Sequence, residues 1–292
     1  MALTTQKGAG WGLARLDSRD TLSFKNFSQY TYDEAAAGAG VDVFVLSTGV
    51  DVKLSDFEER ASWGETIPQD VDEDGNGLGT HLAGIVAGLK YGVAKKAHIW
   101  AVKVAWNDGG ADVKDVIAGL DWVTAHARSS DRPSIALLAP HETEKNVDLD
   151  AAIDRAVAQG VFVVVAAGDD NQDAVNCSPA GVPSAFTVGA STLADERAHF
   201  SNWGPTIDVF APGLNILSSW IGETGKESKT HSGTAQAAAH VAGLAACLIS
   251  SSPDITTANV GSAITVLATK DVLKDIPAGT SNLLAYNNPD KS

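Results

Sequence analysis

The sequence is poor in cysteine, and this shortage excludes a fold held together by disulfides. Only two of the 292 residues are cysteines, Cys177 and Cys247. One pair could form at most one disulfide, whereas small disulfide-stabilised scaffolds carry several. Both cysteines stand among apolar or small residues, which favours two buried thiols.

Basic residues are also scarce: the sequence has 21 Lys and Arg but 36 Asp and Glu, which gives a formal net charge of −15. Nucleic acids and anionic membranes are bound by basic surfaces, so we expect neither as a partner. No apolar run reaches the roughly 18 residues that cross a membrane. The oligomeric state stays open.

The N-terminus, "MALTTQKGAGWGLARLDSRD", lacks the basic and then apolar layout of a secretory signal. We therefore expect no signal peptide or prodomain in this chain and a cytoplasmic or otherwise intracellular protein. The alternative is the mature form of a secreted protein with an added Met1.

Hydrophobic residues, by contrast, make up 44% of the chain, enough for a sizeable core. Short apolar runs predict buried parallel strands at 41–47, 97–104, 133–139 and 160–167. Helical patterns alternate with them at 79–89, 111–127 and 147–160. This alternation predicts an α/β fold, a doubly wound, mostly parallel sheet with helices on both faces. Without a linker or repeat, we expect a single domain over 1–292.

Sheets of this kind bind ligands beyond the carboxyl ends of their strands. Three stretches are expected there: "STG" at 47–49, "AAGDDN" at 166–171, and the turn "HSGTAQ" at 231–236 that leads into a helix. A hydrolase would place a nucleophilic hydroxyl at the tip of such a turn. Here the residue at the tip is Ala235.

These stretches and others follow the pattern of one family. The matching segments are "WGLARLDS" 11–18, "YDEAAAGAGVDVFVLSTGV" 32–50, "DEDGNGLGTHLAGIVAG" 72–88, "YGVAKKAHIWAVKV" 91–104, "VVVAAGDDNQDA" 163–174, "PSAFTVGAS" 183–191, "FSNWGPTIDVFAPG" 200–213, "SGTAQAAAHVAGLAA" 232–246 and "LLAYNN" 283–288. In order and over almost the whole chain, they resemble the subtilisin-like serine proteases, most closely the proteinase K branch of fungal enzymes. The resemblance implies the subtilisin-like three-layer fold.

The family's chemistry uses a serine nucleophile, a histidine base, an aspartate that orients the histidine, and an asparagine in the oxyanion hole. The resemblance puts Ser47 at the aspartate position, His81 at the histidine, Asp169 at the asparagine and Ala235 at the serine. In subtilisin, the relative on which such losses were measured, removing the serine costs about a millionfold in turnover. The resemblance therefore implies a pseudoprotease with no serine peptidase activity.

The expected ligand pocket is the former substrate groove. Its candidate lining residues are Trp106, Leu138, Ala139, Pro140 and Thr234. Pro140 has no N–H to offer a bound peptide strand, so the usual extended peptide mode is doubtful. Thr234 and Ser232 are also expected to satisfy amides at the start of the following helix.

One calcium site is implied by the resemblance to the proteinase K group. Its oxygen ligands would come from the carbonyls of Pro183 and Ala185 and from Asp208. The acidic run at 70–77 resembles a calcium loop only superficially, because His81 stands where the twelfth-position glutamate would be. No other cofactor is expected.

Two functions follow. In the first, a small molecule, peptide or partner protein occupies the former groove without being cut. In the second, a repurposed enzyme uses His81 and Asp169 for proton transfer or an intramolecular cyclisation of a small molecule, for instance in fungal biosynthesis. The carboxylate would raise the pKa of His81 and burial would lower it. An engineered knockout is disfavoured, because the differences extend far beyond one residue.

Overall fold

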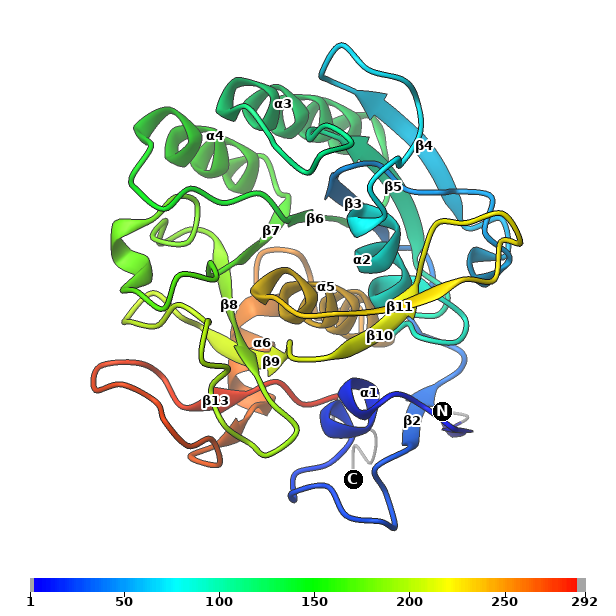
Figure 1. The fold of residues 1–292 in the computed structure, drawn as a ribbon, viewed down its shortest axis with the longest axis vertical. Helices are drawn as coiled ribbons and strands as arrows, with labels where there is room; N and C mark the ends of the chain where they lie inside the picture. Colours follow the sequence, from blue (N-terminus) through cyan, green and yellow to red (C-terminus); the bar gives the residue numbers. More distant parts are fainter. Residues whose placement is uncertain (1–2, 288–292) are drawn as a thin grey trace.

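The computed structural model describes residues 3–287 and is built around a nine-stranded sheet (Figure 1). Its strands are β3 (Asp42–Ser47), β4 (Ala61–Thr66), β5 (His98–Lys103), β6 (Ser134–Leu138), β7 (Phe162–Ala166), β8 (Phe186–Ser191), β9 (Val209–Pro212), β12 (Thr269–Lys270) and β13 (Leu283–Leu284). The order across the sheet is β12-β13-β9-β8-β7-β6-β3-β5-β4. Every neighbouring pair is parallel except β12–β13.

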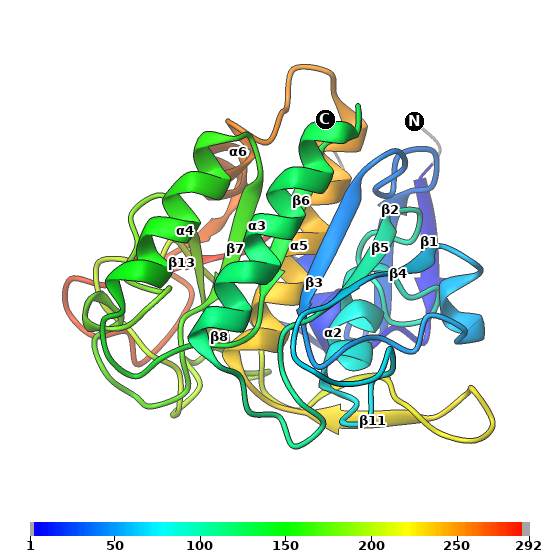
Figure 2. The same cartoon turned by 90° about the horizontal axis from the view of Figure 1, so that it is seen from above.

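Helices cover both faces of this sheet. They are α1 (Trp11–Leu16), α2 (Leu78–Ala87), α3 (Val113–Ser129), α4 (Val147–Ala158), α5 (Thr234–Ser251) and α6 (Val260–Leu267). Figure 2 shows α3 and α4 side by side on one face and α5 behind the sheet. Helix α2 packs against α5 on that second face. The doubly wound, three-layer α/β fold is therefore confirmed.

The predicted strands are confirmed as β3, β5, β6 and β7. In the sheet these four strands are direct neighbours, in the order β7-β6-β3-β5. All six residues of β3 are buried, which explains why its sequence is a continuous apolar run rather than an alternating one. The predicted helices are α2, α3 and α4, and each end lies within two residues of its prediction. Helix α2 stops at Ala87, because Gly88 has left the helical conformation.

Helix α5 is the central core helix and corrects one expectation. It is long and apolar enough to cross a membrane by length and composition, although the sequence analysis finds no run of that length. In the fold, 83% of it is buried, against strands β6 to β9 and helix α2. Small residues permit this packing: a Cβ on Gly243 would lie 2.7 Å from the Val93 side chain.

Two short antiparallel pairs lie outside the main sheet and have no strong sequence signal. Strand β1 (Leu3–Lys7) pairs with β2 (Gln29–Asp33), and β10 (Ile216–Ser219) pairs with β11 (Ser228–His231). Strand β10 packs on α2, and Figure 1 shows the hairpin crossing beside α2 and the start of α5. Among the cysteines, Cys177 is buried as expected, whereas Cys247 on α5 is half-buried.

Candidate functional site

The fold gathers the expected site residues at the carboxyl edge of the sheet. Ser47 is the last residue of β3, and Asp169 follows β7 after Gly168, whose φ of +100° favours glycine. His81 lies in the first turn of α2 and Ala235 in the first turn of α5. Strand ends and helix starts meet here because parallel strands alternate with helices.

His81 is fully buried, and its ring faces the β10–β11 hairpin. Its Nε2 lies 3.1 Å from the carbonyl oxygen of Ile216 and 3.0 Å from that of Lys229. Carbonyl oxygens only accept hydrogen bonds, so Nε2 carries the proton and donates to the hairpin backbone. His81 thus fastens α2 to the hairpin.

Burial also sets the protonation of His81. Desolvation of the ring lowers its pKa from 6.5 to about 4, and electrostatic interactions with His231 and Lys229 act in the same direction. The two carbonyl contacts oppose this shift but do not reverse it. Between the two opposed causes weighed in the sequence analysis, burial wins, and the imidazole is neutral near pH 7.

Asp169 is exposed and directed at the start of α5. Its Oδ1 accepts a hydrogen bond of 2.8 Å from the backbone N–H of Thr234. A carboxylate is stabilised there because the first amides of a helix lack partners inside the helix and carry partial positive charge. Asp169 therefore caps α5 from a neighbouring loop.

This arrangement corrects the capping roles expected for Ser232 and Thr234. The hydroxyl of Thr234 accepts from the backbone N–H of Gly168, and that of Ser232 accepts from the N–H of Asn215. Neither hydroxyl bonds an amide at the start of α5. Sequence spacing could not reveal this, because Asp169 reaches the helix from 65 residues away.

The expected groove residues separate into two groups. Leu138 is fully buried in the core, Ala139 is 6% exposed and Thr234 is fully buried, so these three do not line a ligand pocket. Trp106 and Pro140 are half-buried and reachable. A turn closed by the Gly109 N–H on the carbonyl of Trp106 holds the tryptophan at the strand end.

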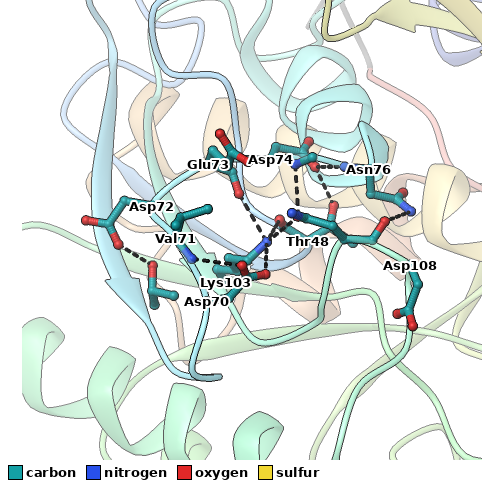
Figure 3. A network of polar contacts seen from close by, with 12 residues as sticks. Thr48, Asp70, Val71, Asp72, Glu73, Asp74, Asn76, Lys103 and Asp108 are labelled. Atoms are coloured by element: carbon teal, nitrogen blue, oxygen red, sulfur yellow. Dashed lines mark hydrogen bonds and ion pairs between the residues drawn. The ribbon is translucent and has the colours of Figure 1, made fainter.

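A polar network beneath α2 was missed by the sequence analysis (Figure 3). Asp74 is its centre: Oδ1 accepts from the Thr48 hydroxyl at 2.8 Å and the Gly77 N–H at 2.8 Å, and Oδ2 accepts from the Thr80 N–H at 2.9 Å. Asp74 thus satisfies the amides that open the helix carrying His81.

Lys103 is the second part of the network and is fully buried. Its ammonium donates to the carbonyls of Thr48 and Glu73 at 2.9 and 3.1 Å and to Asn107 Oδ1 at 2.7 Å, and it lies 3.3 Å from Asp70 (Figure 3). A buried charge is tolerated only when it is paired and hydrogen-bonded in this way. The only sequence signal was a lysine at the end of an apolar strand, "AVKV" at 101–104.

The residues of the expected calcium site come together at the opposite, amino-terminal end of the strands. Pro183, Ala185 and Asp208 line one cavity of about 480 Å³. Asp208 Oδ2 accepts from the Thr187 N–H at 2.7 Å, and burial raises the pKa of the carboxyl to about 6. A partly buried carboxylate beside carbonyl-bearing residues fits a hard cation, which would replace its lost hydration.

The fold, together with the order along the chain of the segments at the carboxyl edge of the sheet, defines this chain as a subtilisin-like α/β protein. The chain belongs to the Subtilase family, whose model matches residues 38–285. It is 48% identical over 301 residues to the subtilisin-like serine protease Pen ch 18 of Penicillium rubens and 47% identical over 303 residues to subtilisin-like protease 8 of Trichophyton verrucosum. These alignments cover 97% of this chain but only 60% and 61% of the relatives, so the chain spans about three fifths of their length.

The solved structures agree. A crystal structure of a cold adapted subtilisin-like serine proteinase superposes with a TM-score of 0.87 at 36% identity, covering 96% of this chain and 98% of that one. That protein and the two relatives are all named as proteases. At the positions that the resemblance assigns to the serine, the aspartate and the oxyanion asparagine, this chain has Ala235, Ser47 and Asp169.

Proposed function

We propose that this chain is a subtilase-fold protein without serine peptidase activity that acts by binding a small molecule or peptide at the former substrate groove. The observation that carries the proposal is Ala235 in the first turn of α5, where the family resemblance expects the serine. A methyl group has no lone pair to attack a carbonyl carbon. Acyl-enzyme chemistry therefore has no nucleophile here.

The neighbours of Ala235 support the same proposal. Ser47 offers a hydroxyl where an aspartate would hold an imidazolium, and the His81 Nε2 is engaged by two backbone carbonyls. Asp169 brings a carboxylate to the place of an oxyanion donor, so a developing negative charge there would be repelled. Each of these features independently weakens proteolysis.

A proton-transfer enzyme based on His81 and Asp169 gains no comparable support. The histidine is fully buried with a pKa of about 4, and the carboxylate is bonded to the start of α5. General bases work best with a pKa near the working pH. Binding through the reachable side chains Trp106 and Pro140 is the function that the geometry favours.

The first prediction tests the absence of peptidase chemistry. Incubated with a fluorophosphonate probe and with denatured casein, the native protein should show no covalent labelling by intact-mass spectrometry and no cleavage. A homologous active subtilase treated in parallel is the positive control. Labelling near one equivalent that disappears on denaturation would overturn the proposal.

The binding half of the proposal needs a separate measurement. Native mass spectrometry of the freshly purified chain should show a copurifying small molecule or peptide, lost in a Trp106→Ala variant and kept in a Trp203→Ala variant. A ligand that leaves chemically changed during incubation would point to the repurposed enzyme instead. If the ligand also copurifies with the Trp106→Ala variant, its binding site lies outside the groove.

A further inference from the structure

The central sheet is open along strand β4. This strand ends the strand order, pairs with β5 and with no other strand among residues 3–287, and is the outermost strand in Figure 1. All six of its residues are half-buried, in contrast to the fully buried β3. An edge strand of this kind presents unpaired backbone N–H and C=O groups, to which a further strand can bind.

The register of β4 on β5 shows which backbone groups are unpaired. The N–H of Ile99 donates to the carbonyl of Arg60 at 2.8 Å, and Ala61 lies opposite Ile99. The backbone groups of Arg60 and Ser62 therefore face β5. Successive residues of a strand turn their N–H and C=O groups to opposite edges, so those of Ala61 and Trp63 point to the open edge. A bulge after Trp63 ends this open stretch.

A cavity of about 370 Å³ lies beside this edge, and Trp63 forms part of its wall. Val52 and Ile221 add apolar surface to the same wall. The indole N–H of Trp63 donates to the Thr66 hydroxyl at 3.1 Å, and that hydroxyl donates to the Asp72 carboxylate at 2.6 Å. These two bonds hold the ring and the carboxylate in place, so a ligand would have little to order on binding.

The wall of the cavity is acidic as well as aromatic. Asp51, Asp72 and Glu73 line it, and Lys53 is the one basic residue that does. Glu73 enters the network of Figure 3 only through its backbone carbonyl, which leaves its exposed carboxylate without a partner among residues 3–287. Over residues 51–74 the chain has nine acidic and two basic residues. A cation in this cavity would meet carboxylates and an indole ring, the aromatic side chain that binds cations best.

We propose that the edge of β4 binds an extended basic segment of a partner protein, which pairs with residues 61–63 as an added strand and places an Arg or Lys side chain in the cavity. Residues directly opposite each other on paired strands have their side chains on the same face of the sheet. A basic residue opposite Trp63 therefore reaches the carboxylates beside the indole. The backbone bonds supply affinity, and the cavity supplies the preference for positive charge.

A second copy of this chain fits the edge poorly. Pairing β4 with β4 would bring the acidic residues of two chains together, and like charges across an interface disfavour association. The edge is also separate from the site of the proposed function, because neither Trp106 nor Pro140 lines the cavity. The inference therefore stands or falls independently of binding at the former groove.

Fluorescence anisotropy with a labelled peptide of alternating Arg and Thr tests the proposal. The peptide should bind the native protein, less tightly as the salt concentration rises, and the same peptide with Glu in place of Arg should not bind. N-methylation of the Arg amides and of the Thr amides should differ in effect, because an added strand bonds β4 along one edge only. One set should abolish binding and the other should be tolerated. Equal effects of the two sets, or equal binding of the acidic peptide, would overturn the proposal.

Protein variants locate the peptide. Glu73→Lys should weaken binding about tenfold or more, because it replaces an attractive charge by a repulsive one. Asp254→Lys makes the same change at an exposed residue between α5 and α6 and should bind the peptide like the parent, as should Trp106→Ala. In ¹H–¹⁵N spectra the peptide should shift the amide signals of Ala61 and Trp63. Equal losses in the two lysine variants would mean that only net charge matters, and a loss in Trp106→Ala would put the peptide in the former groove; either result overturns the proposal.

Discussion

At the scale of the residue, one carboxylate shows how the same position can serve two uses. Asp169 stands where the family resemblance expects an oxyanion asparagine, yet it accepts from the Thr234 N–H and caps α5. The sequence located it at the correct strand end and offered it as a partner of His81 in proton transfer, with no sign of its bond to α5. Which amide it bonds depends on the packing of α5 against β7, which no local pattern records.

Restoring the nucleophile tests this scale directly. Ala235→Ser alone should give little peptidase activity, because His81 still donates to the hairpin carbonyls and Asp169 still repels an oxyanion. Adding Ser47→Asp and Asp169→Asn should raise hydrolysis of small activated esters before it raises peptide cleavage, since Pro140 still lacks an N–H for a bound strand. Esterase and peptidase assays on the single and triple variants measure this. Family-like peptidase rates from the single change would contradict it.

A second residue-scale prediction concerns Asp208. Burial raises the pKa of its carboxyl from 3.8 to about 6, so above pH 6 the folded state carries a desolvated charge. Calcium should therefore raise the melting temperature of the native protein at pH 7, and Asp208→Asn should abolish that rise. Without calcium, Asp208→Asn should be no less stable than the parent.

Asp154→Asn is the matched control for the calcium experiment, because Asp154 is exposed on α4 and bonds the Ser184 hydroxyl. That variant should keep the full response to calcium. An unchanged calcium response in Asp208→Asn would exclude the site formed with Pro183 and Ala185.

At the scale of the element, α2 is held at both ends of its first turn. Asp74 bonds its opening amides from one side, and the His81 ring bonds the β10–β11 hairpin from the other. Gly77 allows the hairpin to approach, because a Cβ there would lie 2.4 Å from the Trp220 ring. The site histidine is thus part of the structure that positions it.

Removing the buried ammonium below this helix should be costly. Lys103→Met would leave the carbonyls of Thr48 and Glu73 without their donor and Asp70 without its partner, so we expect a loss of about 3–5 kcal/mol in unfolding free energy. Urea unfolding measures it. Lys114→Met, which removes an exposed lysine paired with Asp112, should change the free energy of unfolding far less, because solvent screens that pair. Similar losses in both variants would mean that the network contributes little.

At the scale of the whole molecule, the fold was largely predictable and the site only partly so. Strands β3, β5, β6 and β7 gave clear signals because parallel strands buried on both faces must be apolar throughout. The two strands of the β10–β11 hairpin have only four residues each, and the contact of the hairpin with His81 spans 135 residues to Ile216. Contacts at that separation follow from the assembled layers, which is why the enclosure of His81 was missed.

The stability of the whole molecule should fall in mild acid. Burial lowers the pKa values of His81 and His240 from 6.5 to about 4. Between these two pH values the histidines are protonated in the unfolded chain but neutral in the folded one. The free energy of unfolding therefore decreases as the pH falls from 6.5 towards 4. Each histidine contributes roughly 3 kcal/mol to this loss. Asp208 has the opposite effect, because burial raises the pKa of its carboxyl from 3.8 to about 6. Between pH 6 and 3.8 the folded state is the one that binds the proton, and the resulting gain in unfolding free energy offsets the loss from about one histidine.

Urea midpoints measured in chelator between pH 7 and pH 4 test this balance, and they should fall as the pH falls, because two buried histidines outweigh one buried carboxyl. The Asp208→Asn variant removes the compensating group and should lose more over the same range. A midpoint that stays level or rises on acidification would mean that the two imidazoles are not buried as neutral rings.

The far edge of the sheet has a consequence for synthesis on the ribosome. Strand β9 acquires its outer neighbour only from Leu283–Leu284, and Asn287 then ties the tail to the carbonyls of Leu16 and Thr31. While the chain is being made, β9 can pair with β8 but keeps an open outer edge until Leu284 emerges. Nascent chains stalled just before Leu283 would present that open edge to one another, so they should aggregate more readily than chains in which Leu284 has paired with β9.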